Sequence, residues 1–124
     1  MLFKDEAVFN AAVRGVFRCN GFKAVHVRET DAPGPLDLVV WKDTELVGWF
    51  ELKIDDEQVR PSQIEFMRNN KLCSMVMRWL NDLEKIQFEW PGQARVKRMS
   101  WTDFCVWVQR LKDRHRIVRS LIEE

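Results

Sequence analysis

Long hydrophobic runs are missing from this 124-residue chain. No apolar stretch approaches the roughly 18 residues that a transmembrane helix needs, and the first residues lack the apolar segment of a signal peptide. We therefore expect a cytoplasmic or otherwise intracellular protein that is not secreted and has no membrane partner.

Cysteine and histidine are also scarce. The three cysteines, Cys19, Cys73 and Cys105, form no CxxC pair, and neither His26 nor His115 lies near a cysteine in sequence. This spacing gives little support to a zinc site or a cysteine nucleophile. Because the cysteines lie in apolar segments, we expect them to be small buried side chains in a reducing compartment.

Neither sign of charge dominates, since the net charge is +1 with 46% hydrophobic and 31% charged residues. This composition and length predict a single folded domain over residues 1–124. The charge is nevertheless unevenly placed: residues 29–57 hold nine acidic residues and two lysines, whereas residues 91–124 hold eight basic and four acidic residues. An acidic pocket with a basic flank suits an enzyme that cleaves phosphodiesters, but such blocks also occur on ordinary solvated surfaces.

The segment 34–63 carries the most informative pattern. Two short apolar runs, 36–41 and 47–54, are separated by a polar turn, which predicts a pair of strands. Asp37 interrupts the first run, and Glu51 and Lys53 interrupt the second. Because side chains alternate along a strand, Glu51 and Lys53 should point to one side of the sheet and their apolar neighbours to the other.

Charges in such apolar strands suit metal-assisted hydrolysis, because burying them is costly unless they are paired or bind a metal. Asp37 and Glu51, with the backbone carbonyl of Leu52, would offer Mg²⁺ hard oxygen ligands and leave positions for water and a substrate phosphate. Lys53 would lie beside the bound water and orient it or help to deprotonate it. An ordinary cross-strand salt bridge of Lys53 with Glu51 or Asp37 is the alternative, because a lone E-x-K is a weak pattern.

The order of these residues resembles the PD-(D/E)XK nuclease superfamily: Asp37, then Glu51-Leu52-Lys53 about a hairpin later, then Gln63 just inside a helix. Within that superfamily, residues 3–80 are most similar to small VRR-NUC-type and Holliday junction resolvase-like nucleases. Two features depart from the pattern. The Pro-Asp pair is split by one residue, and no tyrosine follows the glutamine as it does in the RecB-type branch.

The resemblance implies a restriction-endonuclease-like core and a Mg²⁺-dependent nuclease of DNA repair or recombination, in which Mn²⁺ would substitute. It implies Asp37 and Glu51 as metal ligands and Lys53 as the water-orienting base. Gln63 would be a helper near Lys53 or the DNA backbone, and Glu6 an accessory metal-binding carboxylate.

The first helix is predicted over residues 3–18 from its apolar stripe, and Glu6, Asn10 and Arg14 recur every four residues on its polar face. If this face borders the pocket, Glu6 assists the metal and Arg14 meets a phosphate. If it faces solvent, Glu6 is simply an acid favoured near a helix N-terminus. In the strand predicted over 22–28, His26 is expected to point at solvent or a helix rather than to act as a base.

After the central strands, the acidic turn 55–57 is either solvated or supplies an outer-sphere metal partner. A helix then begins at Arg60-Pro61-Ser62 with Ser62 as its cap, runs to about Asn70, and buries Ile64 and Met67. Further strands are predicted over 73–77 and 86–90.

A long helix is predicted over residues 100–122, capped by Ser100 and carrying a heptad-like apolar stripe. Its second half is a candidate surface for a homodimer or for DNA, although packing on its own domain is the commoner fate of such a stripe. Seven basic residues along the chain are candidate phosphate contacts: Arg14, Arg60, Arg68, Lys71, Arg95, Lys97 and Arg98.

The sequence thus predicts an α/β domain with a mixed central sheet of about five strands, flanked by helices and extended by the C-terminal helix. The predicted function is a metal-dependent DNA endonuclease that selects junctions, flaps or ends by structure, because no base-reading motif is visible. The alternative is a non-catalytic nucleic-acid-binding or assembly module that keeps the nuclease fold. A restriction-type endonuclease would need sequence readout that we do not find.

Overall fold

The computed structural model describes residues 3–27 and 36–111. In these residues three helices accompany one sheet of six strands. Their order along the chain is α1 (Glu6–Cys19), β1 (Lys23–His26), β2 (Leu38–Lys42), β3 (Glu45–Ile54), α2 (Pro61–Asn69), β4 (Ser74–Leu80), β5 (Lys85–Glu89), β6 (Val96–Ser100) and α3 (Trp101–Leu111).

The strands lie in the sheet in chain order, from β1 at one edge to β6 at the other. Only β3 and β4 run parallel, and α2 is the crossover between them, whereas every other neighbouring pair is antiparallel. The predicted fold class, a mixed sheet flanked by helices, is confirmed. The expected strand number of about five was wrong by one, because the basic segment around Lys97 and Arg98 forms β6.

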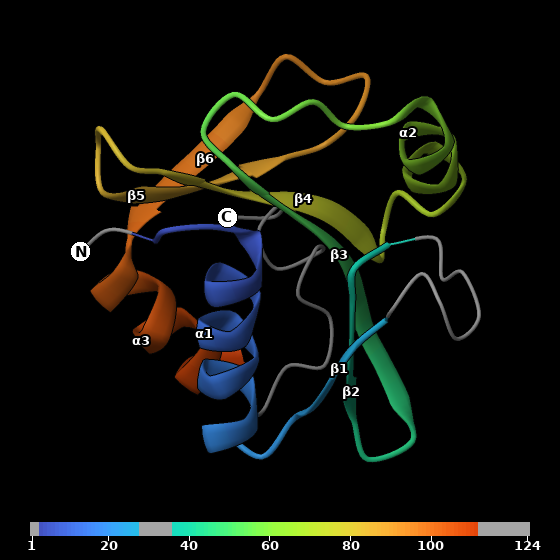
Figure 1. Cartoon of the computed structure of the whole chain (residues 1–124). Helices are drawn as coiled ribbons and strands as arrows, with labels where there is room; N and C mark the ends of the chain where they lie inside the picture. Colours follow the sequence, from blue (N-terminus) through green and yellow to red (C-terminus); the bar gives the residue numbers. More distant parts are fainter. Residues whose placement is uncertain (1–2, 28–35, 112–124) are drawn as a thin grey trace.

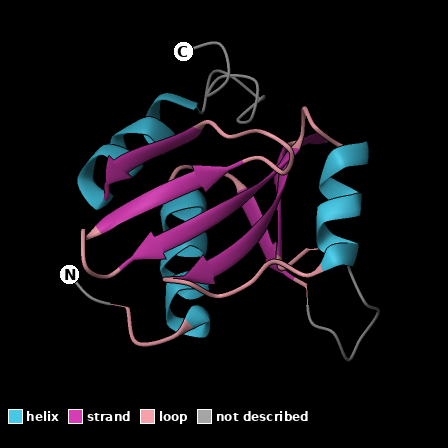
Figure 2. Ribbon diagram, turned by 90° about the horizontal axis from the view of Figure 1, so that it is seen from above, coloured by secondary structure: helices cyan, strands magenta, loops and turns pink. Residues whose placement is uncertain are grey.

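Helices α1 and α3 lie side by side on one face of the sheet, and α2 lies on the other (Figures 1 and 2). Asp5 caps α1 by accepting a hydrogen bond from the Val8 amide, 3.0 Å. Apolar residues of α1 and α3, such as Phe9, Phe17 and Phe104, are fully buried against the inner side of β3, β4 and β5. Leu52 belongs to this core, so its neighbours Glu51 and Lys53 face the opposite side, as predicted.

Helix α2 covers the outer side through Met67, which packs with Leu36 and Val76. The predicted cap at Ser62 was wrong, since the helix begins at Pro61 and its N-cap residue is Arg60. The backbone amide of Arg60 donates a hydrogen bond to the Gln63 side-chain oxygen, 2.9 Å. The expectation that Ile64 is buried also fails, because Gln63 takes that place beside Met67.

Three further expectations concern the cysteines, the cap of α3 and the C-terminal helix. The cysteines are not buried, since Cys19 is exposed and Cys73 and Cys105 are half-buried. Ser100 does cap α3, because its hydroxyl accepts a hydrogen bond from the Asp103 amide, 3.1 Å. The second half of the predicted C-terminal helix, with its proposed dimer surface, lies outside the described residues, as do His115 and the loop 28–35. No described helix has the length and apolar character needed to cross a membrane.

Candidate functional site

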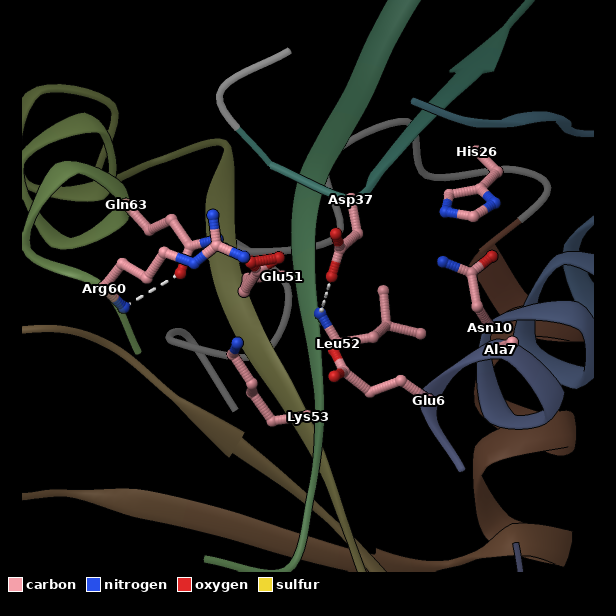
Figure 3. A pocket seen from close by; sticks show the side chains of 10 residues that line it. All are labelled: Glu6, Ala7, Asn10, His26, Asp37, Glu51, Leu52, Lys53, Arg60 and Gln63. Atoms are coloured by element: carbon pink, nitrogen blue, oxygen red, sulfur yellow. Dashed lines mark hydrogen bonds between the residues drawn. The ribbon is translucent and has the colours of Figure 1, made fainter. Parts of the chain in front are cut away.

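A pocket of about 280 Å³ lies along β3 beside the start of β2, and it is lined by residues of α1 from one face of the sheet and of α2 from the other (Figure 3). It gathers all of the predicted catalytic residues. Its lining consists of Glu6, Ala7, Asn10, His26, Asp37, Glu51, Leu52, Lys53, Arg60 and Gln63 (Figure 3). Two of the charged members are buried, with Glu51 at 0% exposed and Lys53 at 7%.

Strand pairing places Asp37 next to Glu51. Residue Asp37 directly precedes β2, and the first β2 residue, Leu38, pairs with Phe50 of β3. The Asp37 carboxylate therefore reaches the middle of β3, where it accepts a hydrogen bond from the Leu52 amide, 3.2 Å (Figure 3). The backbone carbonyl of Asp37 accepts from the Val27 amide, 2.8 Å, which extends the β1–β2 pairing and holds the residue from the other side.

Helix α2 places Gln63 beside the Glu51 carboxyl group. The Gln63 side-chain amide donates to one oxygen of Glu51, and its own oxygen accepts from the Arg60 amide. Both ends of the side chain are thus engaged, so its orientation is fixed. Because Gln63 lies in the first turn of α2, the helix start is attached directly to the charged patch on β3.

The pKa of the Glu51 carboxyl group is strongly raised. Burial, followed by the hydrogen bond to Asp37 and the negative charge of Asp37, raises its pKa to about 9, although the charge of Lys53 opposes this rise. A carboxyl pair can share a hydrogen bond only when one member carries a proton. One Glu51 oxygen is buried without a hydrogen-bond partner among the described residues.

Glu6 borders the pocket from the side of α1. Glu6 forms a side-chain hydrogen bond with Glu57, which follows β3. Burial, that hydrogen bond and the charge of Glu57 raise the pKa of Glu6 to about 7. Of the two alternatives for the polar face of α1, the structure thus selects the pocket, since Glu6 and Asn10 both line it.

These donors fit a hard divalent cation. Asp37 and Glu51 present carboxylate oxygens at close range, and one of those oxygens is buried and without a partner. A cation placed between them would offset the burial and the negative charge of Asp37 that raise the pKa of Glu51. The described residues contain no group of three or more His, Cys, Asp and Glu side chains placed to hold a metal ion. The predicted donor set contains two such side chains, Asp37 and Glu51, together with a backbone carbonyl, so it has fewer side-chain ligands than such a group.

The predicted phosphate contacts separate into two groups. Arg60 lies at the pocket itself, and Arg14 lies one helical turn from it, where its guanidinium donates to Asn10 Oδ1, 2.7 Å. The other five do not line the pocket. Arg68 borders a separate hollow beside Val96, and Arg98 donates a hydrogen bond to Gln87 on β5. The remaining three line neither the pocket nor the hollow: Lys71, Arg95 and Lys97.

Sequence reasoning did not assign a site role to Asn10 or His26. Asn10 is almost completely buried, and Figure 3 shows the His26 ring directed toward its side chain. For Asn10, the available sequence signal was its i+4 spacing from Glu6 and to Arg14. No local pattern indicated His26, whose place at the pocket follows from the pairing of β1 with β2.

The structure is similar to that of Hjc, a Holliday junction resolvase from the hyperthermophilic archaeon Archaeoglobus fulgidus, with a TM-score of 0.48 and 18% sequence identity. The match covers 76% of this chain and 85% of that chain. No protein-family model and no curated protein sequence matches the chain.

Proposed function

We propose that this protein is a metal-dependent nuclease that hydrolyses phosphodiester bonds in DNA. The observation that carries the proposal is the buried contact between the Asp37 and Glu51 carboxyl groups, in a pocket that Lys53 and Gln63 also line. Buried charged groups are costly for stability, so a site that collects them without full pairing indicates a ligand.

Asp37, Glu51 and the backbone carbonyl of Leu52 would hold Mg²⁺, with Glu6 as an accessory carboxylate and Mn²⁺ as a substitute. The bound ion would supply Lewis-acid activation of water and neutralise phosphate charge. Gln63 would keep the Glu51 carboxylate oriented through the hydrogen bond described above. Lys53 would orient the attacking water and offset the negative charge that develops on the phosphoryl oxygens.

Arg60 would bind a backbone phosphate at the mouth of the pocket, with Arg14 as a second contact one helical turn away. Both would recognise the phosphate backbone rather than bases. We therefore propose that the substrate is selected by its structure, as a junction, flap, end or duplex, and not by a long sequence.

Cleavage of labelled duplex, single-stranded, flap and four-way-junction DNA tests the proposal, with Mg²⁺, Mn²⁺ or EDTA present. Wild type is compared with Asp37→Asn, which preserves side-chain size but removes the charge. We expect cutting that requires the metal and falls to background in the variant.

A folded wild-type protein that cuts none of these substrates with either metal would contradict the proposal. If it still binds branched DNA, the chain is a binding or assembly module that retains the fold. Equal cutting by wild type and Asp37→Asn would place the reaction elsewhere in the molecule.

A further inference from the structure

Arg78, on β4, is an extensively bonded arginine side chain that the proposed reaction does not yet use. It pairs in register with Lys53 on β3, so both side chains lie on the outer side of the sheet. The Arg78 guanidinium makes two hydrogen bonds to Glu89 on β5, 2.6 and 3.3 Å. Its third nitrogen donates to the backbone carbonyls of Asp55 and Glu57, both 2.7 Å.

The segment that Arg78 holds is the tight turn at the end of β3. Asp55 adopts a positive φ of 51° there, a conformation that L-residues rarely occupy and that neighbouring contacts must stabilise. The carboxylate of Glu57 turns back onto the strand and accepts a hydrogen bond from the Ile54 amide, 2.7 Å. The two carbonyl contacts of Arg78 therefore fix the turn to β4, while the Glu57 carboxylate fixes it to the end of β3.

The same turn is tied to the start of α1. The Asn81 backbone and side-chain amides donate to the two Asp55 carboxylate oxygens, 2.8 and 3.0 Å. The Asn81 side chain also bonds the backbone of Phe3, three residues before Glu6. The turn that follows β3 and the segment that precedes α1 are consequently locked to one another.

We infer that Arg78 is a positioning residue: by fixing the turn over 55–57 it holds the end of β3, where Lys53 directly precedes Ile54, and so keeps Lys53 in place beside the reacting phosphate. The inference rests on the proposed nuclease function. A lysine at this position would not serve, because a single ammonium group cannot reach the Glu89 carboxylate and both carbonyls together.

The test compares wild type with Arg78→Ala, Arg78→Lys and Glu57→Gln in metal-dependent cleavage, below the unfolding temperature of each. Arg18→Ala is the matched control, because Arg18 also donates two hydrogen bonds to a backbone carbonyl, that of Ala24, but at the far end of α1. Hydrogen exchange at the Ile54 and Glu57 amides is measured in the same proteins.

We expect both Arg78 variants to lower kcat by about 10- to 100-fold with KM little changed, and Arg18→Ala to keep the wild-type kcat. Exchange at Ile54 and Glu57 should become faster in the Arg78 variants alone. Because Arg78 acts through the turn that carries Glu57, a double variant with both Arg78→Ala and Glu57→Gln should be no slower than the slower of these two single variants.

An Arg78→Ala protein with wild-type kcat, or equal losses in Arg78→Ala and Arg18→Ala, would overturn the inference. Unchanged exchange at Ile54 would overturn it as well, whatever the activity. Failure of the proposed function is a separate result, since wild type itself would then cleave nothing.

Discussion

The side-chain amide of Gln63 donates a hydrogen bond to the carboxylate of Glu51, and this bond joins the first turn of α2 to the middle of β3 inside the pocket. Both residues are buried, at 8% and 0% exposed. The bond fixes one Glu51 oxygen and leaves the other, which has no partner among the described residues, for a ligand. It is the connection on which the geometry of the proposed metal site depends most.

Replacing Gln63 should therefore impair both catalysis and stability. Gln63→Ala leaves a Glu51 oxygen and the Arg60 amide without their partners, so we expect cleavage to fall about 10- to 100-fold and the free energy of unfolding to fall by about 1–3 kcal/mol. Ser62→Ala, at an exposed neighbouring position, is the control and should change neither. Single-turnover cleavage and urea unfolding measure the two effects. Normal cleavage by Gln63→Ala would exclude the positioning role.

The raised pKa of Glu51 predicts how stability depends on pH without metal. Burial, with the Asp37 contact, raises this pKa from 4.5 to about 9, so the folded protein keeps a proton that the unfolded chain releases. This contribution to stability is complete below the unfolded value and is lost as pH rises toward the folded value. We expect the free energy of unfolding to fall by at least about 2 kcal/mol between about pH 5 and pH 8.

The matched variant for this measurement is Glu51→Gln, which cannot ionise. Urea unfolding of this variant in EDTA should show a clearly flatter pH dependence than wild type. Parallel curves for the two proteins would show that Glu51 does not carry the effect.

Lys53→Met should abolish cleavage without unfolding the protein. Methionine keeps the apolar stem that is buried on β3 but removes the ammonium group that orients water and offsets phosphate charge. We expect a loss of at least about 100-fold in the cleavage rate, with metal-free DNA binding retained. Lys85→Met, at an exposed position of β5, is the control. A Lys53→Met enzyme as active as this control would contradict the assignment.

Arg60→Ala should weaken DNA binding evenly across sequences. If the guanidinium at the pocket contacts one phosphate, the slope of log affinity against log salt should become shallower by roughly 1. Fluorescence anisotropy at several salt concentrations measures this slope, with Arg18→Ala as the control. An unchanged slope would remove Arg60 from the phosphate contacts.

The arrangement of the central strands could be predicted from sequence because it depends on local alternation. Charged side chains at Glu51 and Lys53, set among apolar neighbours, indicate one face of a strand, and the structure places both in the pocket. Gln63 could be placed near them because a short crossover helix returns close to the strand that precedes it. The role of the pocket itself stays a prediction.

Other parts depend on contacts between distant segments. The basic run containing Lys97 and Arg98 gave no strand signal, because β6 is an edge strand whose alternation of apolar residues is weak. The acidic turn over 55–57 is exposed, as expected, but the sequence did not indicate that Arg78 donates to two of its backbone carbonyls. Neither contact has a signature in the local sequence, since each joins residues that are far apart in the chain.

The central claim is that Asp37 and Glu51 together hold a divalent cation, and calorimetric titration of the DNA-free protein with Mn²⁺ tests it most directly. We predict binding to wild type that weakens strongly in both Asp37→Asn and Glu51→Gln, accompanied by proton release because Glu51 must ionise to bind the ion. Equal Mn²⁺ affinity in wild type and the two variants, or no binding by folded wild type, would contradict the account.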